Sequence, residues 1–137
     1  MIKYRSLHAY KYQIMEDYEF QLDVTKCGPL NLDALGDAFF LCLLADGMLM
    51  VMEGYAYDGP SGPTIDTENS MRASLVHDAL YQLMRLGVLP QSAKKHADQL
   101  LYDLCVEDGM SKFRAYYWWL GVKYFGIWAS RCEVKDE

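Results

Sequence analysis

The chain lacks the cysteine spacing of metal-binding and disulfide-rich proteins. It has four cysteines in 137 residues, and none belongs to a CxxC pair, so no zinc knuckle is indicated. Single cysteines in apolar or terminal contexts are typical of reduced thiols in a cytosolic-type protein. The N-terminal residues also lack the apolar core of a signal peptide.

Long apolar runs and positive charge are both scarce. The stretch at residues 115–129 is rich in tryptophan, but Lys123 interrupts it, and it falls short of the roughly twenty residues that a membrane span needs. We therefore predict no transmembrane span and interpret this stretch as a buried or partner-facing helix. The chain has 13 Lys and Arg against 19 Asp and Glu, a net charge of -6. Because an acidic surface repels phosphate backbones, we do not expect nucleic-acid binding.

Apolar residues, by contrast, are abundant. Hydrophobic residues make up 52% of the chain and aromatic residues 14%, which is enough to build a core. We predict a single domain over residues 1–137. Within it, residues 1–63 are expected to be β-rich and to end in a Gly/Pro loop, and residues 67–132 are expected to be helical. Only the tail at residues 133–137 is expected to be disordered.

The N-terminal part shows the pattern of strands. Apolar and polar residues alternate with period two through residues 3–24, which predicts two half-buried strands joined by a turn at residues 16–17. Apolar runs at residues 39–44 and 48–53 flank an Asp-Gly pair at 46–47, and this pair favours a second tight hairpin.

Three helices are predicted in the C-terminal part. The first begins at one of several competent caps near residue 67 and ends at Gly87; the second runs over about residues 90–107. Ser111 caps a third helix, which reaches about Arg131. The fold is therefore predicted to be α+β, with N-terminal antiparallel β-hairpins packed on a C-terminal three-helix half.

Polar residues interrupt the apolar faces of the first two helices. His77, Asp78 and Tyr81 lie in an otherwise apolar helix, where burial costs free energy unless each polar group has a partner. If the first two helices form an antiparallel hairpin, Asp98 lies opposite the turn that holds these residues, and Tyr102 lies opposite His77. His77 and Tyr81 share one helix face because they are four residues apart.

A general-base histidine is one use of this arrangement. A carboxylate on one imidazole nitrogen fixes the tautomer and stabilises the ring when the other nitrogen takes a proton. On this interpretation His77, Asp98 and Tyr81 form the catalytic set. The residues assigned to substrate binding are Ser61, in the Gly/Pro loop, and Tyr102.

A metal site is a second interpretation. Asp78 is expected to point toward the loop that carries Asp58, and two carboxylates with loop carbonyls would suit calcium or magnesium. His77 with Asp58 and Asp98 would instead suit zinc. A third interpretation is a polar network that only joins the two helices. The sequence leaves all three open.

Two further predictions concern the surface. His96, next to Lys94 and Lys95, is expected to face solvent. The third helix carries aromatic residues on more than one face, so part of it belongs to the core and the remainder could form an exposed patch that binds a partner.

Four motifs follow one another along the chain. They are Gly54, Asp58, Ser61 and Pro63, then His77, Asp78 and Tyr81, then Ala97-Asp98, then Tyr124-Phe125-Gly126. In combination, these motifs resemble the DUF1353 family, which is widespread in bacteriophages and prophages. The resemblance spans about two-thirds of the chain and supports the fold, while the family name records no activity. A family arginine before the Ala-Asp pair is replaced here by Lys94 or Lys95.

The loop, the His-Asp-x-x-Tyr helix and the later aspartate are also similar to secreted phospholipase A2. That similarity implies that Asp78 and the backbone of residues 59–62 hold calcium, with His77 as base and Asp98 as its orienter. The disulfide framework of that family is missing, however, and the loop contains two prolines.

The resemblance to DUF1353 implies a phage protein, and the residues predict a hydrolase that uses a His-Asp dyad. Its cofactor is left open, with a divalent cation, calcium or zinc, as the candidate. Whether it is an enzyme at all stays open. The alternative is a non-enzymatic virion or tail component, or an inhibitor of a host defence protein, that acts by binding a host or phage protein. Either function places the protein in the host cytoplasm or the virion. The sequence leaves the substrate and the oligomeric state undetermined.

Overall fold

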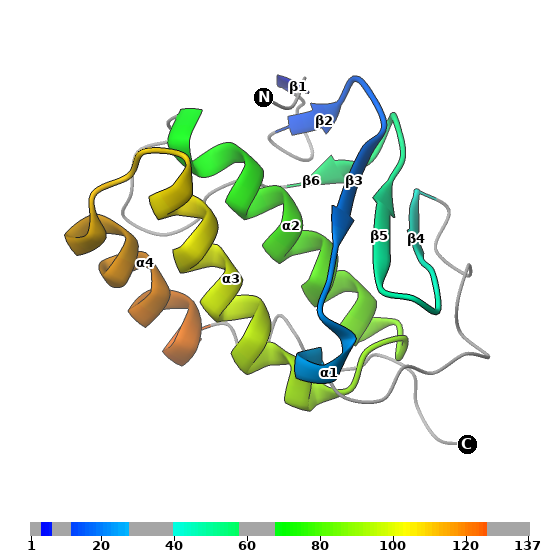
Figure 1. The fold of residues 1–137 in the computed structure, drawn as a ribbon. Coiled ribbons are helices and arrows are strands. Elements are labelled where there is room, and N and C mark those ends of the chain that lie inside the picture. The colour runs from blue at the N-terminus through cyan, green and yellow to red at the C-terminus, as the bar shows by residue number, and fades with distance from the viewer. Residues whose placement is uncertain (1–3, 7–11, 28–39, 58–67, 126–137) are drawn as a thin grey trace.

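The computed structural model describes residues 4–6, 12–27, 40–57 and 68–125. Its elements form small antiparallel sheets and a set of helices, so the predicted α+β fold is confirmed (Figure 1). The strands are β1 (Tyr4–Ser6), β2 (Tyr12–Ile14), β3 (Tyr18–Gln21), β4 (Leu41–Leu43), β5 (Met48–Val51) and β6 (Ala56–Tyr57). The helices are α1 (Val24–Cys27), α2 (Glu68–Arg85), the 3-10 turn η2 (Gln91–Ala93), α3 (Lys94–Glu107) and α4 (Lys112–Phe125).

The six described strands form two three-stranded antiparallel sheets, ordered β1-β2-β6 and β3-β5-β4. The predicted hairpin at the Asp-Gly pair is confirmed, with Leu41 opposite Val51 and Leu43 opposite Leu49. Its turn closes with a hydrogen bond of 2.9 Å from the Gly47 amide to the Leu44 carbonyl. Only Gly47 takes a positive φ there, 94°, which a residue without Cβ adopts at little cost.

The hairpin predicted at residues 16–17 is wrong. β2 pairs with β1 and β6, whereas β3 pairs with β5, so the chain passes from one sheet to the other between them. Asp17 is used differently: its carboxylate accepts a hydrogen bond of 2.7 Å from the Glu53 amide. Alternation identifies the buried face of a strand but not its partner, which explains the error.

The strand predicted up to Val24 is also too long. The Asp23 carboxylate accepts hydrogen bonds from the Thr25 amide at 3.0 Å and from the Thr25 hydroxyl at 2.5 Å. This local bonding starts the short helix α1 instead of continuing the strand.

The three long helices lie where the sequence predicts them. After α2, Gly87 takes a φ of 82°, and the Val88 amide donates to the Leu83 carbonyl at 2.9 Å, which closes the helix end. At the start of α4, the Ser111 hydroxyl accepts a hydrogen bond of 3.2 Å from the Arg114 amide. The predicted end of the third helix, near Arg131, lies outside the described residues.

Helix α2 is central to the fold. It lies between the β3-β5-β4 sheet and α3, and α3 lies between α2 and α4 (Figure 1). Over residues 70–85, only four α2 side chains are not buried, and these are Arg72, Asp78, Gln82 and Arg85. A histidine on this helix is therefore enclosed by the core and needs polar partners. Among the described residues, no helix combines the length and the apolar character required to cross a bilayer.

Candidate functional site

Asp98, on α3, is the centre of a buried polar cluster with His77, Tyr81 and Lys94. Its side chain is only 3% exposed. One carboxylate oxygen, Oδ1, lies 2.8 Å from His77 Nε2 and accepts a hydrogen bond of 2.5 Å from the Tyr81 hydroxyl. The other oxygen, Oδ2, accepts a hydrogen bond of 2.6 Å from Lys94 Nζ. We call these four residues the polar cluster.

Helix geometry explains how His77 and Tyr81 reach the same oxygen. They are four residues apart on α2, so both project from one face of the helix. Their ring centroids are 4.1 Å apart, with an interplanar angle of 43°. The antiparallel packing of α2 and α3 then brings Asp98 against both rings, as the helix-hairpin argument predicts. These contacts establish position; the catalytic role assigned to His77, Tyr81 and Asp98 stays a prediction.

The protonation of the cluster follows from its contacts. Burial would raise the pKa of Asp98, but hydrogen bonds from His77, Lys94 and Tyr81 outweigh it and lower that pKa below its ordinary value. Burial and Asp98 together raise the pKa of Tyr81, which therefore keeps its proton. An ionised carboxylate can only accept hydrogen bonds, so His77 Nε2 carries a proton and donates it.

The second imidazole nitrogen, Nδ1, faces Asp78. The distance from Nδ1 to Asp78 Oδ1 is 3.8 Å, and the Asp78 side chain is 29% exposed. Burial would lower the pKa of His77, but the hydrogen-bonding and charge interactions of Asp78 and Asp98 raise it above its ordinary value. Because Nε2 is committed to Asp98, Nδ1 is the nitrogen that gains or loses a proton.

Lys94 is the member of the cluster that the sequence interpretation missed. It was expected beside a solvent-facing His96, but its side chain is only 13% exposed. Its ammonium group also donates to two carbonyls of α4, Val122 O at 3.1 Å and Lys123 O at 3.2 Å. The available signal was its spacing from Asp98, since a cation and a carboxylate four residues apart share a helix face.

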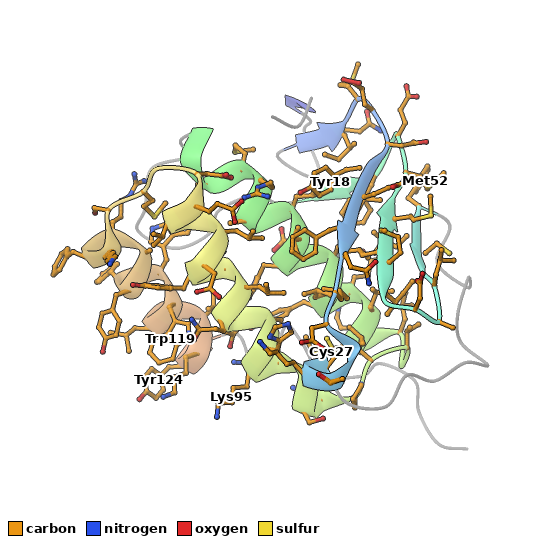
Figure 2. All side chains as sticks on the ribbon, in the orientation of Figure 1. Tyr18, Cys27, Met52, Lys95, Trp119 and Tyr124 are labelled. Carbon is orange, nitrogen blue, oxygen red and sulfur yellow. The ribbon has the colours of Figure 1, made fainter. Side chains whose placement is uncertain are left out.

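The neighbours of Lys94 differ from it. Lys95 is exposed and projects outward near the start of α3 (Figure 2). His96 is half-buried instead of solvent-facing, and burial and the charge of Lys26 lower its pKa.

The structure does not bring every predicted site residue together. Asp58 and Ser61 lie outside the described residues, so their assigned roles stay predictions. Tyr102 is partly buried against the core, and the hydrogen bonds of the described residues do not connect it to the polar cluster. Within the described ranges, no group of three or more His, Cys, Asp or Glu residues is placed to hold a metal ion.

Comparison with known proteins places the chain in a family. Residues 37–122, more than half of the sequence, match the model of DUF1353, described as "Protein of unknown function (DUF1353)". The chain belongs to the DUF1353 family. In this DUF1353 protein the matched region includes the whole polar cluster and its α4 contact at Val122.

No curated protein and no solved structure gives a match to this DUF1353 chain. The similarity to phospholipase A2 is thus not borne out, and the calcium site it implied is not adopted.

Proposed function

We propose that this DUF1353 protein is a hydrolase in which His77 is the general base and Asp98 orients it. The observation that carries the proposal is the 2.8 Å contact of His77 Nε2 with a buried carboxylate, which leaves Nδ1 as the exchangeable nitrogen. A carboxylate in this position fixes the imidazole tautomer and stabilises the imidazolium ion that forms during proton transfer.

The proposed reaction is hydrolysis of an ester. Nδ1 takes a proton from water as the water oxygen attacks the carbonyl carbon, and Asp98 stabilises the resulting imidazolium. The same proton passes from Nδ1 to the leaving alcohol as its bond to the carbonyl carbon breaks. Asp78 lies beside Nδ1 and is partly exposed, which supports an approach of water and substrate from its side. Tyr81 holds Asp98 Oδ1 through its hydroxyl.

A panel of p-nitrophenyl carboxylic esters tests the proposal. The wild type is expected to hydrolyse at least one of them, and His77→Gln to reduce kcat by roughly 100-fold or more, because general-base catalysis contributes about that much. His96→Gln is the matched control, since it removes the same imidazole from α3 outside the polar cluster. Equal rates for the wild type and His77→Gln would contradict the proposal.

A second measurement does not depend on the choice of substrate. Diethyl pyrocarbonate modifies neutral imidazole nitrogens that small reagents can reach, and mass spectrometry of peptides locates the modified histidine. A general base must be reachable at Nδ1, so modification of His77 is expected. If His77 resists the reagent in the folded protein while His96 reacts, the cluster is sealed and the hydrolase proposal fails.

A protein-binding function has separate support in the surface of α4. Phe113, Tyr116 and Tyr117 of α4 are exposed. Figure 2 shows Trp119 and Tyr124 projecting from α4 away from the sheets. Exposed aromatic side chains on one helix are typical of interaction surfaces. This favours the alternative of a virion or tail component, or of an inhibitor that binds a host protein, in the host cytoplasm or the virion.

Matched variants separate the two functions. If binding is the function, a partner captured by the wild type is lost with Tyr116→Ser/Tyr117→Ser and retained with His77→Gln. If hydrolysis is the function, His77→Gln abolishes turnover, and the double tyrosine variant keeps it.

A further inference from the structure

Lys94 connects the polar cluster to a third helix. Its ammonium group has three protons and three acceptors: Asp98 Oδ2 at 2.6 Å, Val122 O at 3.1 Å and Lys123 O at 3.2 Å. The side chain is therefore fully bonded, although it lies almost entirely inside the protein.

The two carbonyls belong to the last four residues of α4 that the structure describes, 122–125. Hydrogen bonds from an ammonium group to backbone carbonyls are charge-assisted and stabilise a nearly buried cation. Lys94 thus connects α4 to the same carboxylate that contacts His77.

We infer that Lys94 is a positioning residue for the His77 base: it anchors Asp98 Oδ2 to α4 and so keeps Asp98 Oδ1 on the imidazole. The inference rests on the proposed function and adds α4 to the elements that build the site. The sequence motifs do not assign this role, because Lys94 contacts Val122 and Lys123, which lie 28 and 29 positions further along the chain.

The balance of donors explains why this anchor matters. Asp98 Oδ1 accepts hydrogen bonds from His77 and Tyr81, whereas Oδ2 accepts one from Lys94. Without Lys94, a nearly inaccessible carboxylate oxygen would have no donor among the described residues, which is costly for a charged group. The carboxylate would then rotate toward other donors, and the imidazole would lose its fixed partner.

The test is the NMR signal of the His77 Nε2 proton in protein labelled with ¹⁵N-histidine, measured in the wild type and in Lys94→Met. Methionine keeps most of the unbranched side chain and removes its charge and donors. We expect the low-field, hydrogen-bonded signal of the wild type to be lost or to move upfield in Lys94→Met. On any ester that the wild type hydrolyses, kcat should fall roughly 10- to 100-fold, as for a misplaced catalytic group, with little change in KM.

Lys95→Met is the matched control and should leave both readouts unchanged, since Lys95 is exposed on the same helix. If Lys94→Met does not fold, Lys94→Gln is measured in its place by the same criterion. An unchanged His77 signal in the variant that folds overturns the inference, and so does an equal loss in Lys95→Met. Absence of any hydrolysis in the wild type would count against the proposed function alone, because the NMR signal still decides the role of Lys94.

Discussion

The imidazole of His77 lies between two carboxylates, and this decides when it can act as a base. Asp98 bonds Nε2, and Asp78 lies beside Nδ1. Burial works in the opposite direction, yet the two acidic neighbours raise the pKa of His77 above its ordinary value of 6.5. A folded-state pKa above the unfolded value means that stability from the imidazolium is fully present below about pH 6.5 and is lost as the pH rises through the folded pKa.

Turnover should therefore increase with pH on the alkaline side of 6.5, because only neutral imidazole accepts a proton. Asp78→Asn removes one of the charges that raise the pKa of His77, so it should move the rising limb of kcat/KM to lower pH. The measurement is the kcat/KM profile of both proteins on one ester from about pH 5.5 to about pH 9. If the rising limb of the kcat/KM profile has the same midpoint in Asp78→Asn as in the wild type, Asp78 does not set the pKa of His77.

Asp98 should also be the most sensitive carboxylate for stability. Asp98→Asn leaves the Lys94 ammonium buried without its charged partner, and breaking a buried ion pair in this way costs about 3–5 kcal/mol. Urea unfolding of Asp98→Asn and of Asp103→Asn, an exposed position on the same helix, gives the comparison. The second change should cost less than about 0.5 kcal/mol. Similar losses in both variants would contradict the buried-pair description.

At the scale of secondary structure, the sequence predicts what local chemistry controls. Gly87 ends α2, Ser111 caps α4, and Gly47 turns the β4-β5 hairpin, and in each case the residue type determines a nearby backbone conformation or hydrogen bond. The contact of His77 with Asp98 follows from two predicted helices and a short connection. The partners of β2 and the burial of Lys94 depend on distant segments, which periodicity does not encode.

Two glycines, one after α3 and one inside α4, provide a matched test of this local control. Gly109, after α3, has a φ of 103°, and no atom lies within 4 Å of an added Cβ. Alanine at this position would therefore clash with no neighbour, and its cost would come from backbone strain alone. Gly121 lies inside α4, also with open space, and its φ is not positive. Gly109→Ala should destabilise the protein by roughly 1–2 kcal/mol, and Gly121→Ala should stabilise it by about 0.5–1 kcal/mol. Thermal unfolding measures both, and changes of the same sign would refute the explanation.

At the scale of the whole molecule, Arg72 joins the sheet to the helices. From α2 its guanidinium binds Asp108, at the end of α3, through two hydrogen bonds of 3.0 and 2.9 Å, and it lies 3.2 Å from Glu107. Burial would lower the pKa of Arg72, but its interactions with Asp108 and with Tyr18 of β3 raise it. Parallel bonds from one guanidinium to one carboxylate are among the stronger polar contacts of proteins. Arg72 therefore stabilises the arrangement of α2, α3 and β3 on which the polar cluster depends.

Arg72→Met should lower the free energy of unfolding by roughly 1–3 kcal/mol, the range for hydrogen bonds to charged groups, while keeping the apolar part of the side chain. Its described partners do not include the polar cluster, so kcat on a hydrolysed ester should stay within about twofold of the wild type wherever the variant is folded. Urea unfolding and ester kinetics on the same samples, with Lys95→Met as the exposed control, measure both effects. A loss of turnover with stability unchanged would mean that Arg72 affects His77 directly. The view that Arg72 only stabilises the fold around the polar cluster would then be wrong.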